Sequence, residues 1–485
     1  MTLKTRALHA AVWYGATRTL TQAMSWVVTI VLARLLTPAD YGIFAMAVGA
    51  LIFLELFQEL GLGTAVVQRR HLAPAQLNAI FWLLMALSTL VGAVTFLGAD
   101  VIASIYAEPR LAALLRLLSV TFLANSVRVV PYALLTKTLD LKSRSLADVA
   151  GTVMASAVAL VTASMGLGVL ALVWGHLARG VVLSAVMLYL SPWRPGLTVS
   201  FAELRSMLVF GGQMTATHLV GSVSPLVNNM LVARLLSGEA LGLFTMAESI
   251  SSTPHRISTA LMNQVSLPVF SESQENRRTL QDHFLTISKY LAVVALPVQI
   301  GFALTAPELV HMVLSDKWLS VVVPLQILAI GGAVTAATMT ATPLLSATGR
   351  ADMLLRIGLV THVALAVATV AGTPWNVTGL AVASLVVTVV ARGYLFALTL
   401  RELAIPASRY AAAVLAPLKA VGAMSVAVIA SQAAQPGLSP IMGLLMSVLI
   451  GGSVYVAVLF LSDHALYLEF RGIARELLSP APSGA

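Results

Sequence analysis

The sequence contains no cysteine among its 485 residues, and only 10% of the residues are charged. The absence of cysteine excludes disulfides, thiolate metal sites and cysteine nucleophiles. A soluble globular domain carries about 25% charged residues, so the shortage of charge excludes an ordinary soluble fold. The sequence also lacks a P-loop, a nucleophile elbow, an HExxH motif and a loop-borne carboxylate cluster. We therefore expect no cofactor, no metal site and no enzymatic activity.

Hydrophobic residues make up 58% of the chain. Apolar runs of about 20 residues, long enough to cross a bilayer, recur from end to end between short polar loops. This pattern predicts an all-α polytopic membrane protein with about fourteen transmembrane helices. The predicted spans lie near residues 11–36, 41–63, 79–106, 114–136, 147–166, 168–190, 207–236, 240–268, 284–306, 319–347, 353–372, 377–399, 411–432 and 439–461.

The distribution of basic residues predicts the orientation of these spans. Alternate loops form two sets, and the set that contains both termini holds seventeen Lys and Arg residues, whereas the opposite set holds five. Cytoplasmic loops retain the excess of basic residues, so both termini are expected in the cytoplasm. The same rule accounts for the net charge of +9 without a nucleic-acid partner. The first apolar stretch is interrupted by Arg18 and is too long for a signal peptide, so we interpret it as an uncleaved span.

The chain repeats itself after two hundred residues. LARLLTPADYGIFAMA at 32–47 and VARLLSGEALGLFTMA at 232–247 are identical at eight of sixteen positions, including Arg34 with Arg234 and Gly42 with Gly242. Parallel repeats of this kind are related by an axis along the membrane normal. The expected organisation is two pseudo-symmetric six-helix lobes at 1–200 and 201–404, two further helices at 405–465, and a cytoplasmic tail at 466–485.

Charged side chains inside the spans are the strongest functional signal, because such groups normally face a water-filled cavity or a partner. Basic groups outnumber acidic ones seven to three, and guanidinium groups match phosphate oxygens bidentately. Lys289, Lys419, Arg392 and Glu59 lie near span ends, where long side chains reach the interface. The residues predicted to form a cationic substrate cleft are Arg18, Arg128, Arg179, Arg256, His218, Asn228 and Asn229.

Two buried carboxylates, Glu55 and Glu248, leave two interpretations open. They could bind a coupling cation or relay protons, or they could neutralise neighbouring arginines inside the bundle. Pro225 and Pro254 also fall inside spans, and breaks of this kind allow helices to bend around a substrate site.

Several segments resemble a known family. FQELGLGTAVVQRRHLAPAQLNAIFWL at 57–83, the segment at 32–47 and the segment at 232–271 look like the polysaccharide transporter family of bacterial flippases. That family belongs to the multidrug, oligosaccharidyl-lipid and polysaccharide exporter superfamily, and the likeness fades beyond about residue 405. The resemblance implies a flippase of the bacterial inner membrane that moves a polyprenyl-pyrophosphate-linked oligosaccharide to the periplasmic leaflet for surface polysaccharide biosynthesis. It supports Arg18 and Arg256 as cavity arginines.

These observations predict a transporter that works by alternating access, with the lipid-linked oligosaccharide and membrane lipids as its partners. The driving ion (proton or sodium) and an association with the polysaccharide polymerase and export machinery stay open. One alternative is a cation-coupled exporter of small amphipathic compounds, which would favour an acidic cleft. Another is a membrane glycosyltransferase or ligase, which would need a large periplasmic loop.

Overall fold

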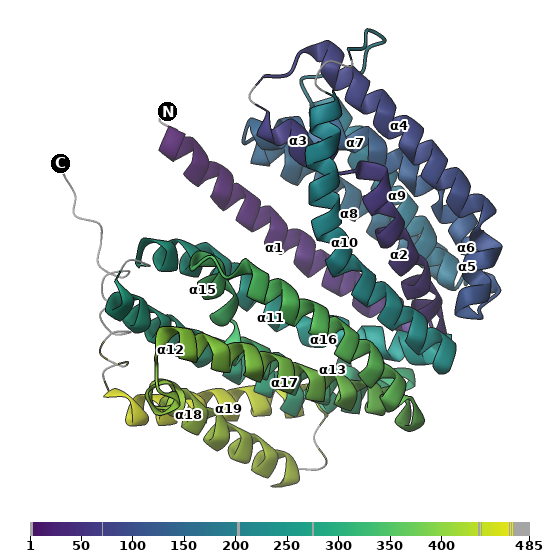
Figure 1. The fold of residues 1–485 in the computed structure, drawn as a ribbon. Helices are drawn as coiled ribbons and strands as arrows, with labels where there is room; N and C mark the ends of the chain where they lie inside the picture. Colours follow the sequence, from purple (N-terminus) through teal and green to yellow (C-terminus); the bar gives the residue numbers. More distant parts are fainter. Residues whose placement is uncertain are drawn as a thin grey trace, which may run out of the picture. The chain divides into compact units, whose positions relative to one another are not determined.

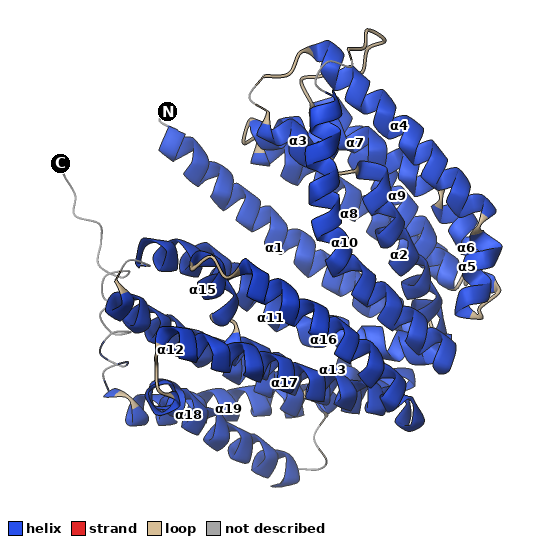
Figure 2. Ribbon diagram, in the orientation of Figure 1, coloured by secondary structure: helices blue, strands red, loops and turns tan. Residues whose placement is uncertain are grey.

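The computed structural model describes residues 3–464 except 70, 201–203, 274–275, 435–436 and 438, and also residues 466 and 468. Within the helices, the side chains of residues 3–14, 16, 217–218, 220, 256–261, 263–265 and 267 lie outside the description. Throughout the described part the chain forms helices joined by short loops and contains no strand (Figure 2). The predicted all-α architecture is confirmed.

The chain divides into two compact units, at 1–245 and 246–485, which we call the N-terminal unit and the C-terminal unit (Figure 1). The boundary falls inside one long helix, α11 (Gly238–Ser273). The predicted lobes, 1–200 and 201–404, stay a prediction. The two compact units are defined by contacts in space, whereas the lobes were inferred from the sequence repeat. Before α11 the chain forms α1 (Leu3–Leu35), α2 (Pro38–Glu59), α3 (Leu62–Gln68), α4 (Pro74–Leu97), α5 (Ala99–Tyr106), α6 (Arg110–Leu118), α7 (Val120–Lys137), α8 (Leu141–Ser164), α9 (Val169–Leu190) and α10 (Leu204–Leu235).

The C-terminal unit continues with long helices and short helical segments between them. They are α12 (Arg277–Leu304), α13 (Ala306–Val313), η1 (Asp316–Val321), α14 (Val322–Thr338), α15 (Ala341–Ala347), α16 (Ala351–Gly372), η2 (Thr373–Trp375), α17 (Asn376–Leu403), α18 (Ala407–Ala434) and α19 (Pro440–Ser462). Helices α18 and α19 pack on each other, and α12 packs on both α14 and α18. The Tyr455 hydroxyl donates a 2.6 Å hydrogen bond to the Val293 carbonyl and so ties α19 to α12.

Ten helical segments of the described chain are long and apolar enough to cross a membrane. One of them, Ala351–Leu403, has 53 residues and contains both α16 and α17. It is long enough to cross the membrane twice, at about 20 residues for each crossing. The predicted spans at 11–36, 207–236 and 240–268 coincide with α1, α10 and α11, whose side chains are only partly described. A polytopic membrane protein is confirmed, and the number fourteen stays a prediction.

The repeat in the sequence is visible in the helix boundaries. Helices α1 and α10 end at Leu35 and Leu235, and α2 and α11 begin at Pro38 and Gly238. Thr37, between α1 and α2, forms a capping box with Asp40. Ser237, between α10 and α11, has a hydroxyl that accepts a hydrogen bond from the Ala240 amide. Equivalent residues therefore satisfy the unpaired amides at both helix starts.

The two repeated helix starts cross in direct backbone contact. A Cβ atom on Gly42 would lie 1.7 Å from the carbonyl oxygen of Gly238, and a Cβ atom on Gly242 would lie 1.8 Å from that of Pro38. Each repeat thus presents the same glycine to the same backbone position of the other. Small residues permit this approach between membrane helices. The aligned glycines of the sequence repeat mark a symmetric helix crossing within the N-terminal unit.

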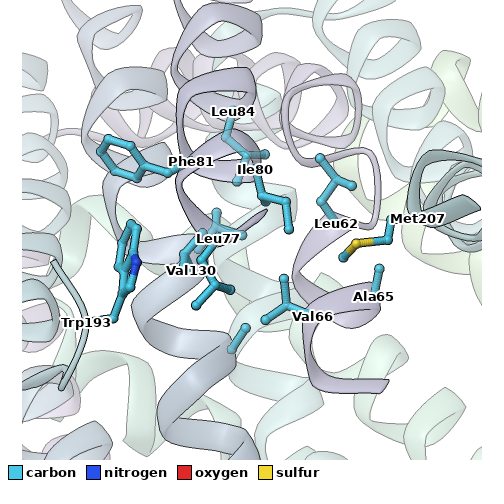
Figure 3. Close-up of a cluster of buried hydrophobic side chains, with 12 residues drawn as sticks. Leu62, Ala65, Val66, Leu77, Ile80, Phe81, Leu84, Val130, Trp193 and Met207 are labelled. Atoms are coloured by element: carbon cyan, nitrogen blue, oxygen red, sulfur yellow. The ribbon is translucent and has the colours of Figure 1, made fainter. Parts of the chain in front are cut away.

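A hydrophobic cluster lies where α3 and the start of α10 meet α4 and α7. Leu62, Val66, Ile80, Leu84 and Val130 are buried together from α3, α4 and α7 (Figure 3). The Phe81 and Trp193 rings meet edge to face at one side of this cluster, with 5.6 Å between their centroids. Met207 brings α10 to the opposite side, next to Leu62 and Ala65 in Figure 3. This packing joins α3, α4, α7 and the start of α10.

Candidate functional site

One face of α1 is polar although the helix is long enough to cross a membrane. The residues on this face recur every three or four positions, which is the spacing of one side of a helix. They are Arg18, Thr21, Gln22, Ser25 and Thr29, and the apolar residues Val28 and Leu32 lie at the end far from Arg18. Such a stripe is costly in lipid and is stable where it faces water or polar partners.

Helices α8 and α9 present the matching faces. Helix α1 packs on α8, and α8 packs closely on α9, because Gly175 lies against the Ala155 carbonyl and Ala159. From α8 come Thr152, Ala155, Ser156 and Ala159, and from α9 come Leu172, Gly175, His176 and Arg179. The Arg179 side chain passes over Gly151, where a Cβ would meet its Cγ at 3.5 Å.

These faces line an open pocket of about 490 Å³ in the N-terminal unit, which we call the α1–α8–α9 pocket. It brings together Arg18 and Arg179, two of the four predicted arginines, and adds His176. The His176 ring meets Phe44 of α2 edge to face, with 6.1 Å between the centroids. A guanidinium from each of two helices gives the pocket a fixed positive charge, since Arg stays protonated in proteins.

The described lining contains no Asp or Glu that could neutralise this charge. Within the described part of the chain, neither Arg18 nor Arg179 forms an ion pair or a side-chain hydrogen bond, and both side chains are exposed to the pocket or its mouth. Their donor groups are therefore available to an anion. A phosphate group offers the geometry that guanidinium groups bind best.

The hydroxyl groups of the pocket are oriented by their own helices. Thr21 donates to the Thr17 carbonyl at 2.9 Å, Thr29 donates to the Ser25 carbonyl at 2.8 Å, and Ser156 donates to the Thr152 carbonyl at 2.7 Å. Each proton is used within the helix, so each oxygen faces outward as an acceptor. Acceptors of this kind suit the hydroxyl donors of a sugar.

A hydrophobic cluster closes the end of the pocket away from the arginines. Leu32 of α1, Ala159 of α8 and Leu172 of α9 are buried together with Leu36, and Val28 and Phe44 pack against them. The pocket therefore has a cationic end and an apolar end. A ligand with an anionic group must place that group at the end that carries Arg18 and Arg179.

Two other predicted residues, Arg128 and Glu55, meet away from this pocket. The Asn125 amide donates to the Glu55 carboxylate at 2.7 Å, and the Arg128 Nε donates to the Asn125 carbonyl oxygen at 3.3 Å. Asn125 thus bridges a carboxylate on α2 and a guanidinium on α7. Nearby, the Gln58 amide donates to the Phe122 carbonyl at 2.9 Å. This α2–α7 polar bridge favours the interpretation in which Glu55 neutralises a neighbouring arginine.

The remaining predicted residues lie elsewhere. Asn228 and Asn229 are half-buried on α10, and the Asn229 amide faces Gly49 of α2. Glu248 is exposed on the part of α11 that belongs to the C-terminal unit. The side chains of His218 and Arg256 lie outside the described residues. Lys289, expected near a span end, forms a 2.6 Å ion pair with Asp463.

Sequence reasoning did not select Thr21, Gln22, Ser25, Thr152 and Ser156 as site residues. The signal was available on α1, where polar residues follow the helical period inside an apolar run. The two α8 residues could not be found in this way, because single Ser and Thr residues are common in membrane helices and bond their own backbone.

The comparison with known proteins agrees with this architecture. A family model described as "Polysaccharide biosynthesis protein" matches residues 31–323. The chain belongs to this family. It is 22% identical over 360 residues to the lipopolysaccharide biosynthesis protein WzxC of Escherichia coli (strain K12), covering 73% of this chain and 72% of the relative. It is 21% identical over 356 residues to the succinoglycan biosynthesis transport protein ExoT of Rhizobium meliloti (strain 1021), covering 73% and 71%.

The fold of this polysaccharide biosynthesis family member matches that of a solved flippase. The lipid II flippase MurJ in an inward closed conformation aligns with a TM-score of 0.77 at 12% identity, covering 94% of this chain and all of the other. At that identity the match shows the fold alone. The predicted family is confirmed, and its relatives are transport proteins rather than enzymes.

Proposed function

We propose that the protein is a flippase that moves a polyprenyl-pyrophosphate-linked oligosaccharide from the cytoplasmic to the periplasmic leaflet of the bacterial inner membrane. It works by alternating access and serves the biosynthesis of a surface polysaccharide, such as an exopolysaccharide, a capsule or an O-antigen. The proposal includes fourteen spans, in two six-helix lobes and two additional helices, with both termini in the cytoplasm. Membership in the polysaccharide biosynthesis family supports it.

The observation that carries this proposal is the chemistry of the α1–α8–α9 pocket. Arg18 and Arg179 project into it without a carboxylate in the described lining. A diphosphate has two phosphoryl groups, and each can accept paired hydrogen bonds from one guanidinium. The hydroxyl oxygens of Thr21, Thr152 and Ser156 then face the sugar that follows the diphosphate.

In the proposed cycle, the arginines hold the diphosphate while the prenyl chain stays in the lipid. Because the lipid interior disfavours charge strongly, the cationic pocket lowers the barrier to moving the diphosphate across it. Release requires that the pocket open towards the other leaflet. A rocking motion of repeats around a fixed site is the usual way in which duplicated transporters achieve this.

The experiment is a flipping assay in proteoliposomes that contain a polyprenyl-pyrophosphate oligosaccharide with a labelled sugar. Arg18→Ala and Arg179→Ala should each reduce flipping strongly, and Arg205→Ala is the matched control, because Arg205 is an exposed arginine outside the pocket. Normal flipping by both pocket variants would refute the assignment of the site. Flipping that is absent in the unmodified protein too, under conditions where the lipid is accessible, would refute the function.

A cation-coupled exporter of small amphipathic cations is the competing function. It needs acidic groups where the substrate binds, and the described lining of the pocket offers none. Cells that carry the protein should therefore gain no resistance to cationic dyes. A deletion strain should instead accumulate a lipid-linked oligosaccharide on the cytoplasmic leaflet.

A further inference from the structure

A second cavity lies in the C-terminal unit, between α16 and α17, with a volume of about 550 Å³. The two helices form an antiparallel hairpin that turns at η2. Its tip is tight, since a Cβ on Gly379 would lie 2.1 Å from the Gly372 carbonyl oxygen. We call this cavity the α16–α17 groove.

The lining of the groove changes along its length. Arg356 and Tyr394 stand opposite each other at the end far from the hairpin tip. Towards the tip the lining consists of small and branched apolar side chains, among them Val360, Ala364, Val386 and Val390. The Thr361 hydroxyl donates to the Ile357 carbonyl at 2.7 Å, so it adds no donor. The groove therefore has a polar end, and its lining is apolar from there towards the hairpin tip.

No carboxylate within the described residues forms an ion pair with Arg356, which lies at the polar end. Arg356 is exposed and forms no ion pair or hydrogen bond within the described residues, whereas its neighbour Arg350 is paired with Glu402 at 3.1 Å. The described lining of the groove contains no Asp or Glu. Arg356 lies five residues after the start of α16, or about 7.5 Å along the helix, which is the depth at which a basic side chain reaches the headgroup region.

We propose that the α16–α17 groove binds an anionic phospholipid. Arg356 and the Tyr394 hydroxyl hold its phosphodiester, and an acyl chain lies along Val360, Ala364 and Val386. The predicted orientation places the Arg356 end at the cytoplasmic leaflet, where anionic headgroups attract basic side chains. The site is separate from the α1–α8–α9 pocket and does not depend on the proposed transport function.

The test is native mass spectrometry of the full-length protein with phosphatidylglycerol or phosphatidylcholine of the same chain length. Arg356→Gln should reduce retention of phosphatidylglycerol about fivefold, the effect of one basic residue at an anionic surface. Ala364→Leu should reduce retention of both lipids by filling the groove. Arg401→Gln, which removes an exposed arginine outside the groove, should leave retention unchanged.

Three results would contradict the proposal. The first is equal retention of phosphatidylglycerol by the Arg356→Gln and Arg401→Gln variants. The second is retention of phosphatidylcholine as strong as that of phosphatidylglycerol by the unmodified protein. The third is displacement of bound phosphatidylglycerol by polyprenyl phosphate at equal concentration, because the groove would then hold the prenyl chain. Each readout is independent of flipping, so failure here leaves the proposed function untouched.

Discussion

Substitution of Gly42 by alanine should destabilise the N-terminal unit. The new Cβ would lie 1.7 Å from the Gly238 carbonyl oxygen, whereas a carbon and an oxygen normally approach no closer than about 3.3 Å. The helices must therefore separate by about 1.6 Å, and overpacking of this kind costs roughly 1–3 kcal/mol. We expect a cost at the upper end of this range, because the obstructing atoms belong to the backbone. Alanine recovers about 1 kcal/mol through its helix propensity, which leaves a net loss of about 2 kcal/mol.

The assay is thermal unfolding in detergent, monitored by circular dichroism. A loss of about 2 kcal/mol should lower Tm by roughly 4–8 °C in a unit of this size. Gly221→Ala is the control, because a Cβ at Gly221 of α10 would meet nothing within 4 Å. Gly242→Ala should match Gly42→Ala, and the double variant should lose less than the sum, since both changes open the same crossing. A Gly42→Ala variant as stable as Gly221→Ala would refute the reasoning.

Three further predictions concern stability. Gly211→Ala should lower Tm, whereas Gly212→Ala at the neighbouring position should not. A Cβ on Gly211 would lie 2.1 Å from the Leu60 carbonyl oxygen, and a Cβ on Gly212 would meet nothing within 4 Å. Equal Tm values for the two variants would contradict this prediction. Asn125→Ala removes the link between Glu55 and Arg128 and should cost about 1–3 kcal/mol in unfolding measurements, and an unchanged value would show that the α2–α7 bridge contributes nothing. Hydrogen bonds from Arg110 lower the pKa of Glu108 below its ordinary 4.5. The stability from this pair is therefore complete above pH 4.5 and is lost as the pH falls further. Because Arg110 is 64% exposed, the loss should be only about 0.2–1 kcal/mol, and Glu108→Gln should abolish this part of the pH dependence.

The sequence predicted the helices and the repeat well, for a physical reason. Apolar runs must be helical in lipid, since each backbone group needs a partner, and the run at 168–190 became α9 (Val169–Leu190). Interruptions inside a run were not predicted. The expected span at 79–106 is divided at Gly98 into α4 and α5, and the span at 114–136 is divided at Ser119. Both breaks lie inside predicted spans, so the apolar runs alone do not mark them.

The lining of the candidate pocket was predicted only in part, because burial in a span does not say which face a side chain occupies. Arg18 and Arg179 line the α1–α8–α9 pocket, whereas Arg128 bonds Asn125 on α7. All three have the same residue type and similar apolar surroundings in the sequence. They differ in the partners that the fold brings near them. The partner of Arg128 is Asn125, three residues before it on the same helix, and Asn125 in turn bonds Glu55.

The most direct test of the cationic pocket is the affinity for a soluble prenyl diphosphate, measured by titration calorimetry in detergent. Farnesyl diphosphate should bind, and farnesol, which lacks the diphosphate, should not. Arg18→Gln and Arg179→Gln should each raise the Kd for farnesyl diphosphate roughly tenfold or more, the effect of losing a charge-assisted hydrogen bond, while Arg205→Gln leaves it unchanged. Equal Kd values for the pocket variants and the unmodified protein would contradict the claim that these two guanidinium groups hold the diphosphate.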